Sequence, residues 1–408
     1  MIVRKIKEDE LKRCHEVMSI AFEFSNQAVQ TNDELVNEAK ECPKTRGQEY
    51  WQEKWAAFED DDKTMMGFMF TIPYTVQFDG QEYPMCGIGG VSTLPQYRKN
   101  GVIRACFEHN LPQMYEDGVA FSYLYPFSTA FYRKFGYEMC GERVFYEIDL
   151  RAYTHFPVEG KTVLAEGTLL SDEIASVYRD FCGNMNLMCV RKPYDFPGAD
   201  GRNPAKDCVY TYVYFAKDAT PKGVMTFTKE QIEPYVFEMK CSQFYFSDWE
   251  GFYGLLNHAL AYKTYYKKIS FWLPSHLDVV SRIPEWAMVP CKRTVAHTGM
   301  NRVINVQKVL KGAQYRGSGV ITIGISDPQI SKNDGAWLVS FADGRANAVE
   351  RTAKTPDITM GISAFSRLIV GSHDTADSLS LPGILVLNPS APFSGVFYKK
   401  PIFIMDSF

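Results

Sequence analysis

The segment from Val91 to Arg104 carries residue types and spacing suited to holding an anion. Its pattern is that of a strand end, a loop and the start of a helix, and the first N–H groups of a helix have no intrahelical acceptor. The helix dipole adds partial positive charge there. Gly101 permits close approach of the backbone, and Arg98, Lys99 and Arg104 add cationic side chains. The segment therefore predicts a grip for a pyrophosphate.

A second chemical candidate is Tyr132, in the aromatic segment from Phe131 to Tyr137. A phenol with a pKa of about 10 can protonate a thiolate whose conjugate acid has a pKa of about 8.5, if the two lie within hydrogen-bond reach. Tyrosine is also a common packing residue, and the chain holds 24 of them. The residues by themselves leave both roles open, a proton donor and a member of an aromatic cluster.

These two segments must be held in place by secondary structure. The hydrophobic pattern predicts that helices and antiparallel strands do so. Apolar residues at helical spacing predict helices over Glu8–Val29 and Asp33–Lys40. Strands are predicted over Met65–Phe78 and Tyr83–Thr93, joined by Asp79-Gly80, because both residues tolerate the positive φ of a tight hairpin. The second strand leads directly into the anion-binding loop.

The helix after the loop has an apolar face of Ile103, Phe107, Leu111 and Met114. Pro112 lies within this pattern, and a proline ring clashes with the carbonyl group four residues earlier in a helix. We therefore expect a kink or an early helix end at Pro112.

The pattern changes after Leu150, and 408 residues exceed one typical domain. We expect an α/β fold class with mixed (α+β) sheets, divided into three domains at 1–150, 151–290 and 291–408. In the second region the pattern predicts helices over Ser171–Asn184 and Trp249–Lys263 and strands over Tyr210–Phe215, Gly223–Thr228, Val236–Phe246 and Lys268–Leu273. In the third it predicts helices over Arg302–Leu310 and Gly361–Val370 and strands over Gly319–Ser326, Ala336–Phe341 and Arg345–Thr352.

The composition argues against nucleic-acid-binding, metal-binding and membrane proteins. The net charge of −4, from 44 basic and 48 acidic residues, argues against a nucleic-acid partner. The ten cysteines form no C-x-x-C pair and the seven histidines show no ligand spacing, so we expect no metal and reduced thiols in a cytoplasmic protein. No apolar run reaches the ~20 residues of a membrane-spanning helix, so we expect no membrane partner.

The ordered set of motifs resembles the GNAT acetyltransferase superfamily. Its cofactor loop reads R/Q-x-x-G-x-G/A, matched by Arg98 to Ile103 except that Ile103 stands where Gly or Ala is usual. Three features make the chain similar to the Eis (enhanced intracellular survival) acetyltransferases in particular. They are the bulky aliphatic residue at Ile103, the V-x-T-x-P motif of Val91–Pro95 and the Y-x-x-F-G-Y motif of Tyr132–Tyr137. Lys134 stands where those proteins often have Arg.

The resemblance implies two tandem GNAT-type domains followed by a domain similar to sterol carrier proteins. Residues 1–150 would bind acetyl-CoA, 151–290 would lack the cofactor loop, and 291–408 would supply the C-terminal carboxylate. Tyr132 would be the general acid, and the α-carboxylate of Phe408 the general base. The cofactor would be held by Val91, Ser92, Thr93, Arg98, Lys99, Asn100, Gly101, Val102, Ile103, Arg104, Phe127 and Ser128.

The tail Pro401–Phe408 is apolar for a chain end, which predicts that it docks in a cleft. The alternative is an ordinary packed last strand. The implied function is N-acetylation of a cationic small molecule, aminoglycoside-like, by a homo-oligomer that the resemblance makes a hexamer. Two alternatives stay open, a protein lysine acetyltransferase and a lipid- or small-molecule-binding protein with a vestigial GNAT core. Asp406, Glu23, Asp33 and Glu34 are candidates to line an acidic cleft for the amine.

Overall fold

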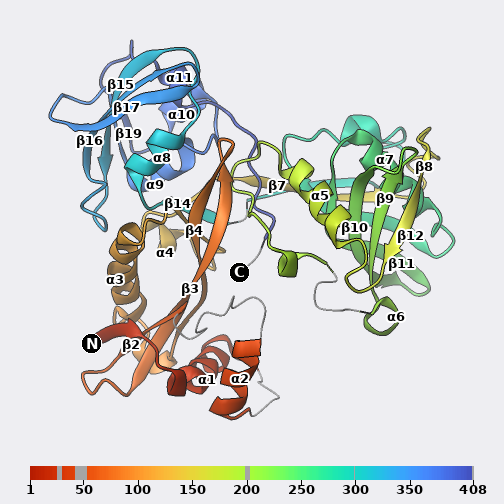
Figure 1. Cartoon of the computed structure of the whole chain (residues 1–408), viewed down its shortest axis with the longest axis horizontal. Helices are drawn as coiled ribbons and strands as arrows, with labels where there is room; N and C mark the ends of the chain where they lie inside the picture. The colour runs from red at the N-terminus through yellow and green to blue at the C-terminus, as the bar shows by residue number, and fades with distance from the viewer. Residues whose placement is uncertain (25–29, 42–52, 198–202, 298, 407–408) are drawn as a thin grey trace. The chain divides into compact units, whose positions relative to one another are not determined.

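The computed structural model describes residues 1–24, 30–41, 53–197, 203–297 and 299–406 and divides into two compact units (Figure 1). Unit 1 is formed by residues 1–141, 186–190 and the chain from 298 onward, and unit 2 by 142–185 and 191–297. Within the described ranges, no helix is both long enough and apolar enough to cross a membrane.

The first sheet of unit 1 is built around a long hairpin. Asp79 and Gly80 turn the chain with φ values of 48° and 77°, as the sequence predicted. The order of the strands is β1 (Ile2–Lys5), β2 (Lys54–Phe58), β3 (Met65–Phe78), β4 (Gln81–Thr93), β5 (Phe121–Leu124), β14 (Met300–Val303) and β6 (Glu138–Met139). β4 and β5 are parallel, and the connection between them is the helix α3 (Val102–Glu116).

Helices cover both faces of this sheet. Apolar residues of α1 (Leu11–Phe22) and α2 (Asn32–Glu41) cluster with Ala56, Phe58 and Phe68, while those of α3 cluster with the alternate residues of β2, β3 and β4. The short helix α4 (Thr129–Arg133) packs against α3. The predicted first helix begins one turn later than expected, after a 3-10 turn at Glu8–Glu10, and ends at Phe22 because Glu23 adopts a left-handed conformation. Its predicted end at 25–29 lies outside the described residues.

Of the kink or early helix end expected at Pro112, the early end was wrong. α3 continues through Pro112 to Glu116. Its inward face, which includes Cys106, Phe107 and Leu111, is fully buried, and we attribute the continuation to this packing, which outweighs one lost backbone hydrogen bond.

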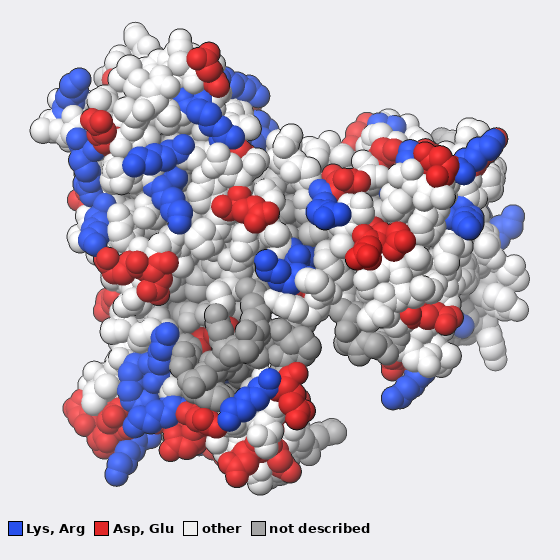
Figure 2. Space-filling view, viewed as in Figure 1, with Lys and Arg blue, Asp and Glu red and all other residues white. Residues whose placement is uncertain are grey.

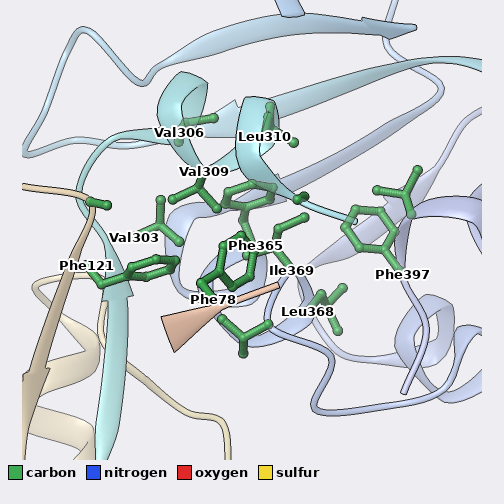
Figure 3. Packing of buried hydrophobic residues seen from close by; sticks show 14 of the residues in the cluster. Phe78, Phe121, Val303, Val306, Val309, Leu310, Phe365, Leu368, Ile369 and Phe397 are labelled. Carbon is green, nitrogen blue, oxygen red and sulfur yellow. The ribbon is translucent and has the colours of Figure 1, made fainter. Parts of the chain in front are cut away.

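The C-terminal part of unit 1 contains a second, five-stranded sheet in the order β17 (Arg345–Thr352), β16 (Gly335–Ala342), β15 (Gly319–Ser326), β18 (Ile358–Gly361) and β19 (Ile384–Val386). Its core is continuous with the first sheet. Phe78 and Phe121 pack in the same cluster as the apolar residues of α8 (Val306–Gly312), α9 (Ile362–Leu368) and the segment around Phe397 (Figure 3). The helices α10 (Thr375–Ser380) and α11 (Phe393–Val396) complete this part.

The prediction of a helix over Arg302–Leu310 was wrong at its N-terminal end and right from Val306 onward. Met300–Val303 form β14, which inserts between β5 and β6, and the helix α8 starts only at Val306. Asn305 marks the boundary, because its side chain accepts a hydrogen bond from the Lys308 N–H at 2.9 Å and caps the helix.

Unit 2 contains one seven-stranded sheet with the helices α5 (Ser171–Cys182), α6 (Pro204–Asp207) and α7 (Trp249–Leu260). The strand order is β13 (Lys292–His297), β7 (Glu142–Asp149), β12 (Tyr266–Pro274), β11 (Val236–Phe246), β10 (Pro221–Glu233), β9 (Val209–Ala216) and β8 (Gly160–Ala165). β11, α7 and β12 form a parallel crossover that repeats the arrangement of β4, α3 and β5.

Candidate active site

The site begins where β4 and β5 diverge. Their parallel pairing runs from Met85↔Phe121 to Ile88↔Leu124, and β4 then continues to Thr93 while β5 ends. On its other side β4 stays paired with β3 across a bulge near Gly90, whose φ is +56°. The stretch from Gly89 to Thr93 therefore turns one backbone edge away from β3 and into the gap.

The loop after β4 reverses the chain and aims the start of α3 at this gap. Lys99 and Gly101 have φ values of 70° and 81°, and Gly101 is the N-cap of α3. The N–H of Ala105 donates to the Gly101 carbonyl at 2.9 Å and is the first N–H of α3 with an acceptor in the helix, so the N–H groups of residues 102–104 have none there. Arg98 Nη2 donates to the carbonyl of Ala21 at 3.0 Å, which ties the loop to the end of α1.

A cavity of about 580 Å³ lies over this helix start. Its apolar walls and its four cationic side chains, Arg98, Lys99, Arg104 and Lys134, fit a long ligand with an anionic group. Many of the residues predicted from the sequence line it together, namely Val91, Thr93, Arg98, Lys99, Gly101, Val102, Ile103, Arg104 and Phe127.

Three predicted cofactor residues lie outside the lining of this cavity. Ser92 alternates with Val91 and Thr93 along the strand, and its buried hydroxyl donates to the Gly90 carbonyl at 2.9 Å. Asn100 is exposed in the loop. The Ser128 hydroxyl accepts from the Phe131 N–H at 3.3 Å and caps α4.

The cavity also has lining residues that the sequence did not single out. They are Ala21, Phe22, Tyr97, Phe131, Lys134 and Phe135. Phe127, Phe131 and Phe135 recur every four residues, a helical spacing from which their common face was predictable. Ala21 and Phe22 are remote in sequence from the loop and carry no local signal.

Tyr132, the predicted general acid, is not among the residues that line the cavity, and it packs behind the lining residues Phe127 and Phe131. Its ring is 5.4 Å from Phe127, 5.1 Å from Phe131 and 6.1 Å from Phe107, between ring centroids, and the residue is 2% exposed. Burial raises the pKa of its hydroxyl above the ordinary value, so the phenol stays protonated at neutral pH. Within the described part of the chain, this hydroxyl has no hydrogen-bond partner.

The C-terminal tail is docked in unit 1. Ile402 forms an isolated bridge with Asn186, and Phe403 and Ile404 are buried. The Tyr125 hydroxyl donates to the carbonyl of Asp406 at 2.7 Å. Since Tyr125 immediately follows β5 and Phe127 lines the cavity, the described end of the tail lies beside the segment that bounds the site. Phe408 lies outside the described residues.

In unit 2 the equivalent helix start is already occupied by the protein's own groups. Asp248 caps α7 by accepting from the Gly251 N–H at 3.0 Å, and Lys222 pairs with Asp248 and Glu250 at 2.8 and 2.6 Å. The strand β11 ends at Phe246, so Ser247 and Asp248 alone link it to α7. This turn presents carboxylates where the first unit presents N–H groups and cations.

The electrostatic pattern of the described surface is mixed. Figure 2 shows Lys and Arg side chains interspersed with Asp and Glu over the visible face of the described residues. Among the described residues, no group of three or more His, Cys, Asp or Glu side chains is placed to hold a metal ion.

Comparisons with known proteins identify two domains in the chain. Residues 2–140 match the family model of the acetyltransferase (GNAT) domain, and residues 306–385 match that of the sterol carrier protein domain. No curated protein matches the sequence.

Three solved structures share the fold over nearly the whole chain. A probable N-acyltransferase from Enterococcus faecalis V583 has a TM-score of 0.82 at 21% identity, with 98% of each chain covered. A GCN5-related N-acetyltransferase from Anabaena variabilis has 0.84 at 18%, and Eis1 from Mycobacterium abscessus has 0.78 at 17%, both with full coverage of each chain.

Proposed function

We propose that this chain, whose residues 2–140 match the GNAT acetyltransferase domain and whose residues 306–385 match the sterol carrier protein domain, is an Eis-like N-acetyltransferase. It would transfer an acetyl group from acetyl-CoA to an amine of a small cationic molecule, aminoglycoside-like. The observation that carries the proposal is the cavity at the start of α3, where N–H groups, Arg98, Lys99 and Arg104 meet apolar walls. That combination suits a pyrophosphate and an uncharged pantetheine arm.

The chain's own residues divide the work. The outward edge of β4 from Val91 to Thr93 offers backbone groups to the pantetheine amides and an N–H as an oxyanion donor. Tyr132, protonated and without a partner in the described residues, donates its proton to the departing thiolate. Glu23 directly follows the cavity residues Ala21 and Phe22 and offers a carboxylate to a cationic acceptor.

The thioester chemistry is tested by mixing the protein with acetyl-CoA and a panel of aminoglycosides and polyamines and following thiol release. We expect release that depends on the amine. Acetyl-CoA binding without release for any small amine would contradict the proposed acceptor class and direct the search to protein lysines.

The α-carboxylate of Phe408 completes the proposed mechanism as general base. The docked tail and the Tyr125–Asp406 hydrogen bond support this role. A short C-terminal extension should therefore lower kcat at least tenfold, within the ~10²–10⁴ that acid–base groups contribute, while the KM for acetyl-CoA stays within about twofold. An N-terminal extension of the same length is the control. Equal turnover in both would remove Phe408 from the mechanism.

The location and assembly are also part of the proposal. The cysteines in the described part of the chain form no disulfide, which suits a reducing, cytoplasmic compartment. We propose a homo-oligomer, hexameric by the Eis resemblance, which sedimentation of the purified protein would test.

A further inference from the structure

The segment that carries Tyr132 is held at both ends by a strand from the far end of the chain. It runs from the end of β5 at Leu124 to the start of β6 at Glu138, and β14 lies between these two strands in the sheet. Met300 pairs with Leu124 on one side and with Met139 on the other. The separation of the two ends of the Tyr132 segment is therefore set by β14, which begins the C-terminal part of the chain.

Arg302 of β14 also grips the segment directly. Its Nε donates to the Phe135 carbonyl at 2.7 Å, Nη1 donates to the Val303 carbonyl at 2.8 Å, and Nη2 binds Asp327 Oδ1 at 2.8 Å. Both side chains of the ion pair are 0% exposed. A cation this deeply buried persists because all three directions of its guanidinium are satisfied.

The turn around Phe135 is shaped for this contact. Gly136 has a φ of +81°, and a Cβ there would lie 2.7 Å from Ile362 and 3.1 Å from Arg302 Nε, so glycine is required. The N–H of Phe135 in turn donates to the Tyr132 carbonyl at 2.9 Å. Arg302 and the backbone of Tyr132 are thus joined through one residue.

A second side chain of the C-terminal part acts beside Arg302. Gln329 Nε2 donates to the Lys134 carbonyl at 2.9 Å. Asp327 orients this loop by accepting from the N–H groups of Gln329 and Ile330, at 3.1 and 3.2 Å. The carbonyls that follow α4 are therefore capped by two side chains from the C-terminal part of the chain. Arg302 belongs to β14 in the first sheet, and Gln329 belongs to the stretch that matches the sterol carrier protein domain.

We propose that Arg302 and Gln329 are positioning residues for Tyr132, through which the C-terminal part of the chain sets the place of the phenol in the active site. This inference rests on the proposed role of Tyr132 as proton donor. It gives the C-terminal part of the chain, through β14 and the loop of Gln329, a function in catalysis besides that of delivering the tail.

The test is a double-mutant cycle in the full-length protein, with acetyl-CoA and an amine acceptor. Gln329→Ala removes a half-buried side chain and should lower kcat roughly threefold or more with little change in the KM for acetyl-CoA. Arg302→Lys keeps the charge but cannot span three acceptors, so it should lower kcat further. In a Tyr132→Phe background, Gln329→Ala should change kcat less than about 1.5-fold, because the group that it positions is gone.

Lys332→Ala is the matched control, since it removes an exposed ion pair from the same loop to Glu116 of α3 and leaves α4 untouched. It should leave kcat unchanged and match Gln329→Ala in melting temperature. Suppose that Tyr132→Phe lowers kcat, but Gln329→Ala either lowers kcat by the same factor in both backgrounds or does not lower it. The positioning role is then refuted, while the role of Tyr132 as proton donor stands. If Tyr132→Phe leaves kcat unchanged, the proposed acid and its positioning fail together.

Discussion

Gly101 occupies the point where the loop gives way to α3, with a φ of +81° and no heavy atom within 4 Å of the place where a Cβ would lie. The new Cβ of a Gly101→Ala variant would clash with no neighbouring atom. The left-handed backbone conformation, however, costs an L-residue roughly 1 kcal/mol. Relaxing that strain turns the N–H groups of α3 away from the cavity. We expect the KM for acetyl-CoA to rise roughly tenfold, as for the loss of one charge-assisted hydrogen bond of about 1.5 kcal/mol.

Gly344 provides the matched control for this substitution. It has a φ of +83°, equally open surroundings and a place in the β16–β17 turn. Gly344→Ala should strain the backbone to the same extent and leave the KM unchanged. An unchanged KM in Gly101→Ala, measured by steady-state kinetics on both variants, would contradict a grip at the start of α3.

Much of the lining of the cavity at the start of α3 could be predicted at this scale because its residues are contiguous. Arg98 to Arg104 share one loop and one helix start, and their chemistry is readable from spacing alone. Phe22 could not be found in this way, since the hydrogen bond of Arg98 to the Ala21 carbonyl that brings α1 to the cavity is a tertiary contact. The structure also separates Ser92 from its neighbours, which strand alternation could have predicted.

At the scale of elements, the helix α7 carries a histidine, His258, whose burial disfavours its protonated form. The His258 ring lies 4.1 Å from that of Tyr212, and its Nε2 is buried without a hydrogen-bond partner in the described residues. Burial lowers the pKa of His258 to about 4. The unfolded chain, with a pKa of about 6.5, binds more protons between these values, so stability falls as the pH falls from 6.5 towards 4.

The expected loss is at most about 3 kcal/mol from this residue. A His258→Gln variant should show a flatter dependence of the unfolding free energy on pH in that window, measured by denaturant titration. If wild type and variant lose stability in parallel between pH 6.5 and 4, then His258 is not a neutral, buried residue in the folded protein.

Elements with a regular pattern were predicted well, whereas elements defined by distant partners were not. The β3–β4 hairpin and α2 lie within two residues of their predicted positions. β14 was assigned to a helix because Val303, Val306 and Leu310 have helical spacing, and what makes Val303 a strand residue is its pairing with Phe121. α3 likewise passes Pro112 because tertiary burial outweighs local preference.

At the scale of the whole molecule, a buried polar cluster fixes the tip of the β3–β4 hairpin to the C-terminal tail. Asp79 binds Lys400 Nζ and the Gln314 N–H, at 2.6 and 2.7 Å, and exchanges two hydrogen bonds with Asn186 at 2.7 and 3.1 Å. Lys400 and Asp79 are 7% and 4% exposed. The cluster joins four segments of unit 1 that are far apart in sequence, and no local pattern could have predicted it.

Removing one partner of this pair leaves a buried charge uncompensated. We expect Lys400→Met to destabilise the protein by roughly 3–5 kcal/mol in urea titrations, and the double variant Asp79→Asn/Lys400→Met to recover part of that loss. The exposed Lys332 pair is the comparison, because its removal should matter little. Equal effects of Lys400→Met and Lys332→Ala would show that the cluster does not anchor the tail.

The central claim is that one domain binds acetyl-CoA and that Tyr132, packed behind the lining residues Phe127 and Phe131, donates the proton that releases the thiol. The most direct measurement is the kcat of amine-dependent thiol release for wild type and Tyr132→Phe side by side, with each KM for acetyl-CoA. The account predicts a kcat about 10² lower in the variant and a KM within about twofold, because the phenyl ring keeps the packing and loses only the proton. A kcat within about threefold of wild type would contradict it.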